Sequence, residues 1–108
     1  MGFINDIELS IKKEDEETFK HAAKVFKALA DPTRLRILSI IEGESMMITG
    51  IVERFNLSQP TVSYHIRILE NAGLVKTVKK GREVYCSLVK KGVLRRALDF
   101  SKWVKGAE

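Results

Sequence analysis

The chain has 108 residues, 44% of them hydrophobic and 31% charged, and its net charge is +5. This length suits a single domain with one core, and the composition is typical of a globular protein. No apolar run approaches the roughly 20 residues of a membrane span, the first residues lack a signal-peptide pattern, and one cysteine excludes an intrachain disulfide. We therefore expect a cytoplasmic protein with no membrane partner.

The N-terminal part of the chain divides into an arm and a helix. Residues 1–14 are weakly patterned and predict an arm, whereas residues 15–108 form the expected domain. From about residue 15 to residue 30, apolar residues recur every three or four positions, which predicts one helical stripe. The stripe consists of Phe19, Ala22, Ala23, Phe26 and Ala30. Asp31 as N-cap and Pro32 in a first turn then indicate the start of a second helix.

The middle of the chain predicts two short helices joined by a tight turn. The second helix, ending near residue 42, is apolar on nearly every side and should lie at the centre of the core. A third helix at 48–55 precedes a fourth at 59–72, for which Ser58 is a good N-cap. This pair is typical of a helix-turn-helix, whose second helix enters the major groove of DNA.

The expected fourth helix carries polar residues on the side opposite Val62, Ile66 and Leu69. Gln can bond adenine, Arg can bond guanine, and Ser or Thr can bond bases or phosphates. The candidate DNA-binding residues of this segment are Ser58, Gln59, Thr61, Ser63, Tyr64, His65 and Arg67. The alternative is a helix whose polar face only meets solvent, because helical hairpins are common in protein cores.

Two β-capable runs, at 74–78 and 83–88, predict a hairpin with a basic tip. Residues 76–96 hold eight bases and one acid, a net charge of +7, which suits a polyanionic partner. The candidate DNA contacts of the tip are Lys79, Lys80 and Arg82, and Gly81 permits the turn. A lysine-rich turn that merely meets solvent is the alternative. With a last helix at 91–105, we predict a mainly α winged helix-turn-helix of about five helices and a two-stranded wing.

Three segments resemble the ArsR/SmtB family of winged-helix repressors: FKALADPTRLRILSII, LSQPTVSYHIRILENAGLV and KKGREVYCSL. The resemblance covers roughly residues 19–104. It implies a homodimeric repressor that binds a palindromic operator in double-stranded DNA and responds to an effector. The dimer residues that it implies are Phe19, Ala22, Phe26, Leu94, Leu98 and Trp103. The alternative for these residues is a place in the core of their own chain.

The chain departs from the metal-sensing members of that family. Met47 and Thr49 stand where one of their sites has cysteines, and the last helix offers only Asp99 among the ligands of the other site. Thiolate, imidazole and carboxylate are the usual ligands of Zn²⁺, so we expect no metal and no other cofactor. Cys86 is expected to be a buried small hydrophobe, and His21 to be a surface or core residue.

Other functional classes stay open as alternatives. The chain could be a metal- or thiol-responsive repressor with a non-standard sensor site, or it could bind an unidentified small-molecule effector at the dimer interface. It could also be a winged-helix module that binds a protein. An enzyme is not expected, because no acid–base pair, activated nucleophile or phosphate loop occurs at a usable spacing.

Overall fold

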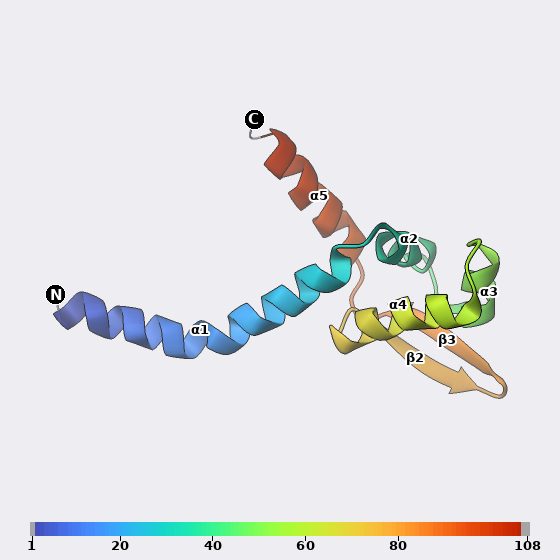
Figure 1. Cartoon of the computed structure of the whole chain (residues 1–108), viewed down its shortest axis with the longest axis horizontal. Coiled ribbons are helices and arrows are strands. Elements are labelled where there is room, and N and C mark those ends of the chain that lie inside the picture. The colour runs from blue at the N-terminus through green and yellow to red at the C-terminus, as the bar shows by residue number, and fades with distance from the viewer. Residues whose placement is uncertain (1, 107–108) are drawn as a thin grey trace.

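The computed structural model describes the backbone of residues 2–106 and the side chains of residues 15–106. Within these residues five helices and three strands occur in the order α1-α2-β1-α3-α4-β2-β3-α5 (Figure 1). The helices are α1 (Gly2–Leu29), α2 (Pro32–Ile40), α3 (Ile48–Glu53), α4 (Gln59–Asn71) and α5 (Val93–Gly106). The strands are β1 (Met46–Met47), β2 (Val75–Lys80) and β3 (Glu83–Leu88). This arrangement is the predicted winged helix-turn-helix.

None of these helices is long and apolar enough to cross a lipid bilayer, over the part of the chain that the structure describes.

The first helix begins earlier than its sequence pattern suggested. The expected start near residue 15 is wrong, because α1 is already helical from Gly2 and includes most of the expected arm. Ile4, Ile7 and Ile11 are spaced by three and four residues, and neither proline nor glycine occurs at residues 3–31, so nothing local interrupts a helix. The side chains of the arm lie outside the described residues.

The wing has one more strand than expected. The sheet has the order β1-β3-β2, and β1 pairs antiparallel with β3 through Met46 opposite Cys86 and Met47 opposite Tyr85. In the hairpin itself Lys80 lies opposite Glu83, so Lys79 and Lys80 belong to β2 and the turn has only two residues. Gly81 takes a φ of 63° at the first of these two positions, where a type II′ turn favours glycine.

The hydrophobic core lies beneath the helix-turn-helix and the sheet. As predicted, α2 is central, with Ile37 and Leu38 fully buried. Val62, Ile66 and Leu69 of α4 pack into the same core, together with Ile51 of α3 and Cys86 of β3. Their spacing along α4 fixes which side of that helix faces inward.

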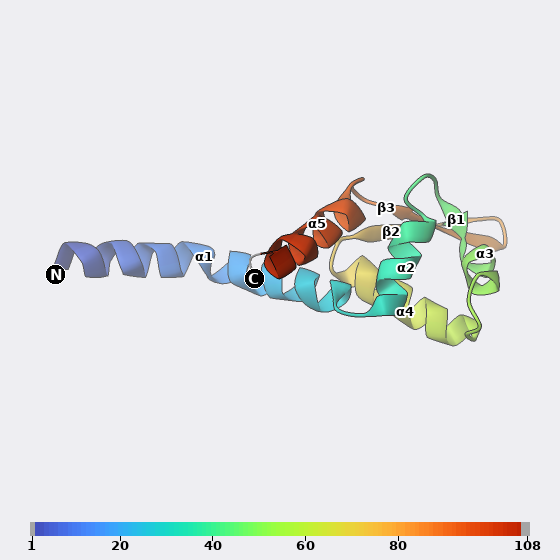
Figure 2. The same cartoon turned by 90° about the horizontal axis from the view of Figure 1, so that it is seen from above.

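Helices α1 and α5 project away from this core (Figures 1 and 2). The radius of gyration is 17.7 Å, whereas a compact chain of this length has about 13 Å. No residue of α5 up to residue 106 is fully buried. Two helices that extend into solvent with apolar side chains indicate a surface that another molecule covers.

Candidate nucleic-acid interface

The outer side of α4 presents most of the candidate DNA-binding residues to solvent. Ser58, Gln59, Thr61, Tyr64 and Arg67 are exposed, while Ser63 and His65 are half-buried. Local capping fixes the start of this helix. The amide of Thr61 donates to Oγ of Ser58 at 3.3 Å, and the two hydroxyls lie 2.9 Å apart. The N-terminal turn of α4 is therefore ordered and open to a ligand in front of it.

His65 turns toward the body of the protein. Its Nδ1 lies 3.0 Å from Nη1 of Arg34. Because arginine can only donate, Nδ1 must accept, and the ring proton of His65 resides on Nε2. His65, a candidate DNA-binding residue, therefore forms a packing contact with Arg34 of its own chain.

Arg34 itself ties α1 and α2 to the recognition helix. It is 9% exposed, and its guanidinium donates to the carbonyl oxygens of Ala28 at 2.7 Å and Lys27 at 3.3 Å. The start of α2 is capped by Asp31, which accepts from the amides of Thr33 and Arg34. Burial opposes the charge of Asp31, but these amide hydrogen bonds and the charge of Arg34 hold its pKa below the ordinary value.

The wing runs beside α4 and is joined to it at its base. Oε2 of Glu70 accepts hydrogen bonds from the amide of Thr77 at 3.2 Å and from its hydroxyl at 2.8 Å. Both views show the hairpin tip at the same end of the molecule as the N-terminus of α4 (Figures 1 and 2). The structure thus brings together the two groups of candidate residues, which are separate in the sequence.

The tip of the wing is basic and exposed. Lys79, Lys80 and Arg82 are all accessible, and Nζ of Lys80 lies 5.3 Å from the ring centroid of Tyr85, within the range of a cation–π contact. Glu83, the one acid of the hairpin, accepts a hydrogen bond from Thr49 at 3.2 Å. This hydrogen bond connects α3 to the first residue of β3. Thr49 is also one of the two positions where, by the family resemblance, one class of metal site has cysteines.

The predicted dimer residues fall into two groups. Phe19 is 60% exposed and Trp103 is 69% exposed, and Phe26 and Leu98 are exposed as well. Ala22 and Leu94 are half-buried, and Leu94 packs against the core of its own chain. Phe100 was not among the predicted dimer residues, although its ring centroid lies 5.9 Å from the ring centroids of both Phe26 and Trp103. The three-residue spacing of Phe100 and Trp103, which places both on one side of a helix, could have identified Phe100 from the sequence.

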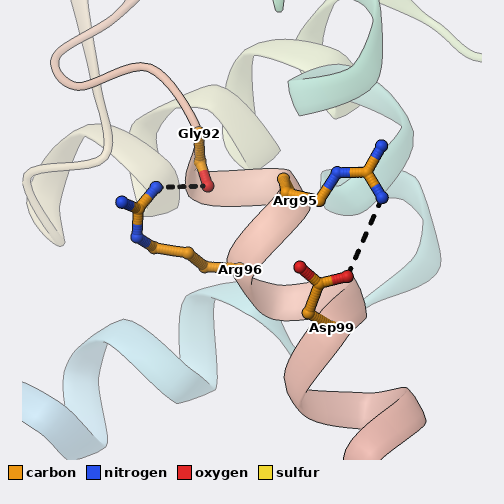
Figure 3. Close-up of polar contacts among 4 residues, drawn as sticks. All are labelled: Gly92, Arg95, Arg96 and Asp99. Atoms are coloured by element: carbon orange, nitrogen blue, oxygen red, sulfur yellow. Dashed lines mark hydrogen bonds and ion pairs between the residues drawn. The ribbon is translucent and has the colours of Figure 1, made fainter.

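Asp99, the one candidate metal ligand of the last helix, has a charged partner on the same helix. Asp99 forms an ion pair with Arg95 at 3.8 Å, one turn before it on α5, and Arg96 donates to the carbonyl oxygen of Gly92 at 3.3 Å (Figure 3). Among the described residues no group of three or more His, Cys, Asp or Glu side chains is placed to hold a metal ion.

Cys86 is fully buried, as expected. Burial raises the pKa of its thiol to about 11, and the negative charge of Glu70 contributes in the same direction. The thiolate is the reactive form of cysteine, so this thiol is in its unreactive form at neutral pH.

Comparison with known proteins places the most similar region at the helix-turn-helix. A family described as "Bacterial regulatory protein, arsR family" matches residues 31–77, from the cap of α2 into β2. Transcriptional repressor SdpR of Bacillus subtilis is 44% identical over 64 residues, which are 59% of this chain and 71% of that protein. An uncharacterized HTH-type transcriptional regulator of Methanocaldococcus jannaschii is 46% identical over 66 residues, 60% of this chain and 74% of that protein.

Solved structures share the same architecture. A homodimeric winged helix-turn-helix DNA-binding domain from Mycobacterium bovis superposes with a TM-score of 0.72 at 23% identity. The match covers 85% of this chain and 84% of that domain. At this identity the likeness concerns the fold alone.

Proposed function

The chain belongs to the ArsR family of bacterial regulatory proteins, and from that premise we propose that it is a homodimeric repressor that occludes a palindromic operator. The observation that carries this proposal is the position of the basic wing tip at the same end of the molecule as the exposed N-terminal turn of α4. An anionic double helix can meet both surfaces at once. A repressor works where the DNA is, so we propose a cytoplasmic location.

In this proposal the two surfaces have different tasks. Side chains on α4 contact base edges in the major groove, with Arg67 and Gln59 as the residues best suited to guanine and adenine. Ser58 and Thr61, at the helix start, suit a phosphate through their exposed hydroxyls, which lie 2.9 Å apart. Lys79, Lys80 and Arg82 contact flanking phosphates or the adjoining minor groove. His65 holds α4 in place through Arg34.

The second copy of the chain is proposed to cover α1 and α5. Phe26, Phe100 and Trp103 form an exposed aromatic group, and an apolar hollow of about 360 Å³ lies between α1, α2 and α5. Large exposed apolar patches usually mark an interaction site. Two-fold symmetry would bring the same patch of each copy together, and would match the two half-sites of a palindrome.

Selection of bound duplexes from a random pool tests the proposal. We expect a palindromic sequence to be enriched, with half-sites about one helical turn apart. Enrichment of a single half-site would exclude the symmetric dimer. If no duplex is retained even at low salt, the protein-interaction alternative replaces the repressor. Repeating the selection with a metal panel and with an oxidant tests the metal- and thiol-responsive alternatives.

A further inference from the structure

A pocket lies between the first helix and the recognition helix, and Tyr64 is the one candidate DNA-binding residue in its lining. It has a volume of about 350 Å³, which is within the range of small-molecule sites. Its side chains come from α1, α2 and α4, and include Lys24, Lys27, Arg34, Tyr64, Ile68 and Asn71. A ligand in this pocket would contact the recognition helix directly.

The polar part of the pocket is cationic. Three of its lining residues are bases, and no acid lines it. Arg34, at 9% exposure, is held in place by the carbonyl groups of Ala28 and Lys27 and by His65. A guanidinium has five N–H groups, and these three contacts use three of them. The described residues provide no acceptor for the other two N–H groups. A preorganised arginine flanked by lysines is suited to a carboxylate.

The remaining wall of the pocket is apolar and aromatic. Ile68 is half-buried, and Tyr64, which also lines the pocket, is 53% exposed. Flat apolar groups pack well against such a ring. We propose that this pocket binds a small aromatic carboxylate, with its ring against Tyr64 and Ile68 and its carboxylate among Lys24, Lys27 and Arg34.

The pocket remains accessible in the proposed dimer. Lys24 and Ala28 lie on the side of α1 roughly opposite the stripe of Phe19 and Phe26, and Lys27 lies between the two sides, since helical positions advance by about 100° per residue. The second copy therefore covers one side of α1 and leaves the other side open. In contrast to the hollow beside Phe26, the pocket is not a part of the proposed interface.

Occupancy of the pocket should weaken DNA binding, a consequence that rests on the proposed repressor function. The ligand would place a negative charge beside α4, where DNA phosphates approach. It would also hold Tyr64, a candidate DNA contact, against α1. By thermodynamic linkage, DNA must then lower the affinity for the ligand by the same factor.

Calorimetry on the full chain without DNA tests the site itself. The probes are 1-naphthoate and 1-naphthamide, which have similar shapes but differ in charge. We expect naphthoate to bind at least tenfold more tightly, and equal affinities would overturn the proposal. Lys24→Ala/Lys27→Ala should weaken naphthoate binding at least tenfold. Lys90→Ala/Lys91→Ala removes the same charge from an exposed turn and should leave naphthoate binding unchanged. An equal loss of affinity in this control would show that only the net charge of the protein matters, and would overturn the proposed site.

A second variant addresses the pocket volume without touching the core. Asn71 is exposed and lines the pocket, so Asn71→Trp should fill the space while the circular dichroism spectrum stays native. We expect naphthoate binding to be lost, and unchanged affinity in this folded variant would place the ligand elsewhere.

Anisotropy measurements on a selected duplex test the coupling to DNA. Saturating naphthoate should lower the DNA affinity severalfold, and DNA should lower the naphthoate affinity by the same factor; no change would overturn the coupling. A chain that binds naphthoate but no duplex would contradict the proposed function and leave the pocket standing. If Lys24→Ala/Lys27→Ala loses DNA affinity without ligand while wild type takes up no naphthoate, these lysines contact the DNA backbone and the pocket proposal is wrong.

Discussion

Arg34 of α2 and His65 of α4 lie 31 positions apart in sequence, yet Nη1 of Arg34 is 3.0 Å from Nδ1 of His65. The same guanidinium donates to two carbonyl groups at the C-terminal end of α1. One buried side chain therefore connects the helix proposed for dimerisation with the helix proposed to read DNA. In the proposed dimer, this contact would set the orientation of the recognition helix relative to the second copy.

Removal of Arg34 should strongly destabilise the fold. Arg34→Ala leaves the buried carbonyl of Ala28 without its donor and His65 without its partner, and we expect the free energy of unfolding to fall by about 2–4 kcal/mol. Urea denaturation measures this change. Arg36→Ala, which removes an exposed arginine from the same helix, should stay within about 0.5 kcal/mol. Equal losses in the two variants would show that Arg34 acts only through its charge or helix propensity.

Thr77→Val should lower DNA affinity modestly. The substitution keeps the shape of the side chain but removes the 2.8 Å hydrogen bond to Glu70 that holds the wing against α4. This bond is exposed, so we expect a change in unfolding free energy of less than about 1 kcal/mol. Valine keeps the 3.2 Å hydrogen bond from the backbone amide to Glu70, so the orientation of the wing is held by one of these two bonds instead of both. We therefore expect a modest fall in DNA affinity, of about twofold, in an anisotropy titration. Glu53→Gln, which neutralises an exposed acid on α3, is the control. An unchanged affinity for Thr77→Val would show that the hydroxyl bond to Glu70 does not orient the wing for DNA binding.

Substitutions on the wing and on α4 should affect DNA binding differently. Lys79→Ala/Lys80→Ala/Arg82→Ala should weaken binding to every duplex and reduce the salt slope by about 2.7, since each phosphate contact contributes about 0.9. Arg67→Ala should instead relax the preference at one base pair by about 1–3 kcal/mol. Measuring both variants on the selected duplex and on single-base variants of it separates the effects. A triple variant with an unchanged salt slope would show that the wing lies away from DNA.

Local signals in the sequence predicted α4 and the position of its exposed residues. Ser58 and Pro60 define the start of this helix, and the spacing of Val62, Ile66 and Leu69 determines its inner face. Which residues are exposed then follows from helix geometry.

Contacts between segments that are far apart in the sequence could not be predicted in this way. Two residues of β1 are too few to show an alternating pattern, and they become a strand only through pairing with β3. The Arg34–His65 and Glu70–Thr77 contacts join different elements. Polar residues at the predicted surface gave no sign that they would have partners.

Cys86 should be unreactive in the folded protein. Its pKa is raised to about 11 from a reference value of 9.0, so at pH 8 the thiolate fraction is about a hundredfold lower than in the unfolded chain. Alkylation by iodoacetamide should therefore be at least a hundredfold slower in the native state than in urea. The raised pKa also means that the contribution of the protonated thiol to stability is complete below pH 9 and is lost as the pH rises through 11. Rapid alkylation of the native protein would return Cys86 to the candidates for a thiol sensor.

Trp103→Glu should separate the proposed dimer without unfolding its subunits. The side chain of Trp103 is 69% exposed in the single chain, so the core of that chain does not depend on it. In a symmetric interface the substitution would bury two unpaired carboxylates, which is strongly unfavourable. We expect sedimentation to show a monomer with a native circular dichroism spectrum, and operator affinity to fall at least tenfold because one half-site no longer assists the other. Lys102→Glu changes the charge at the adjacent exposed position and should leave the dimer intact. If Trp103→Glu remains a dimer, the aromatic group on α5 faces solvent and the two copies meet through other surfaces.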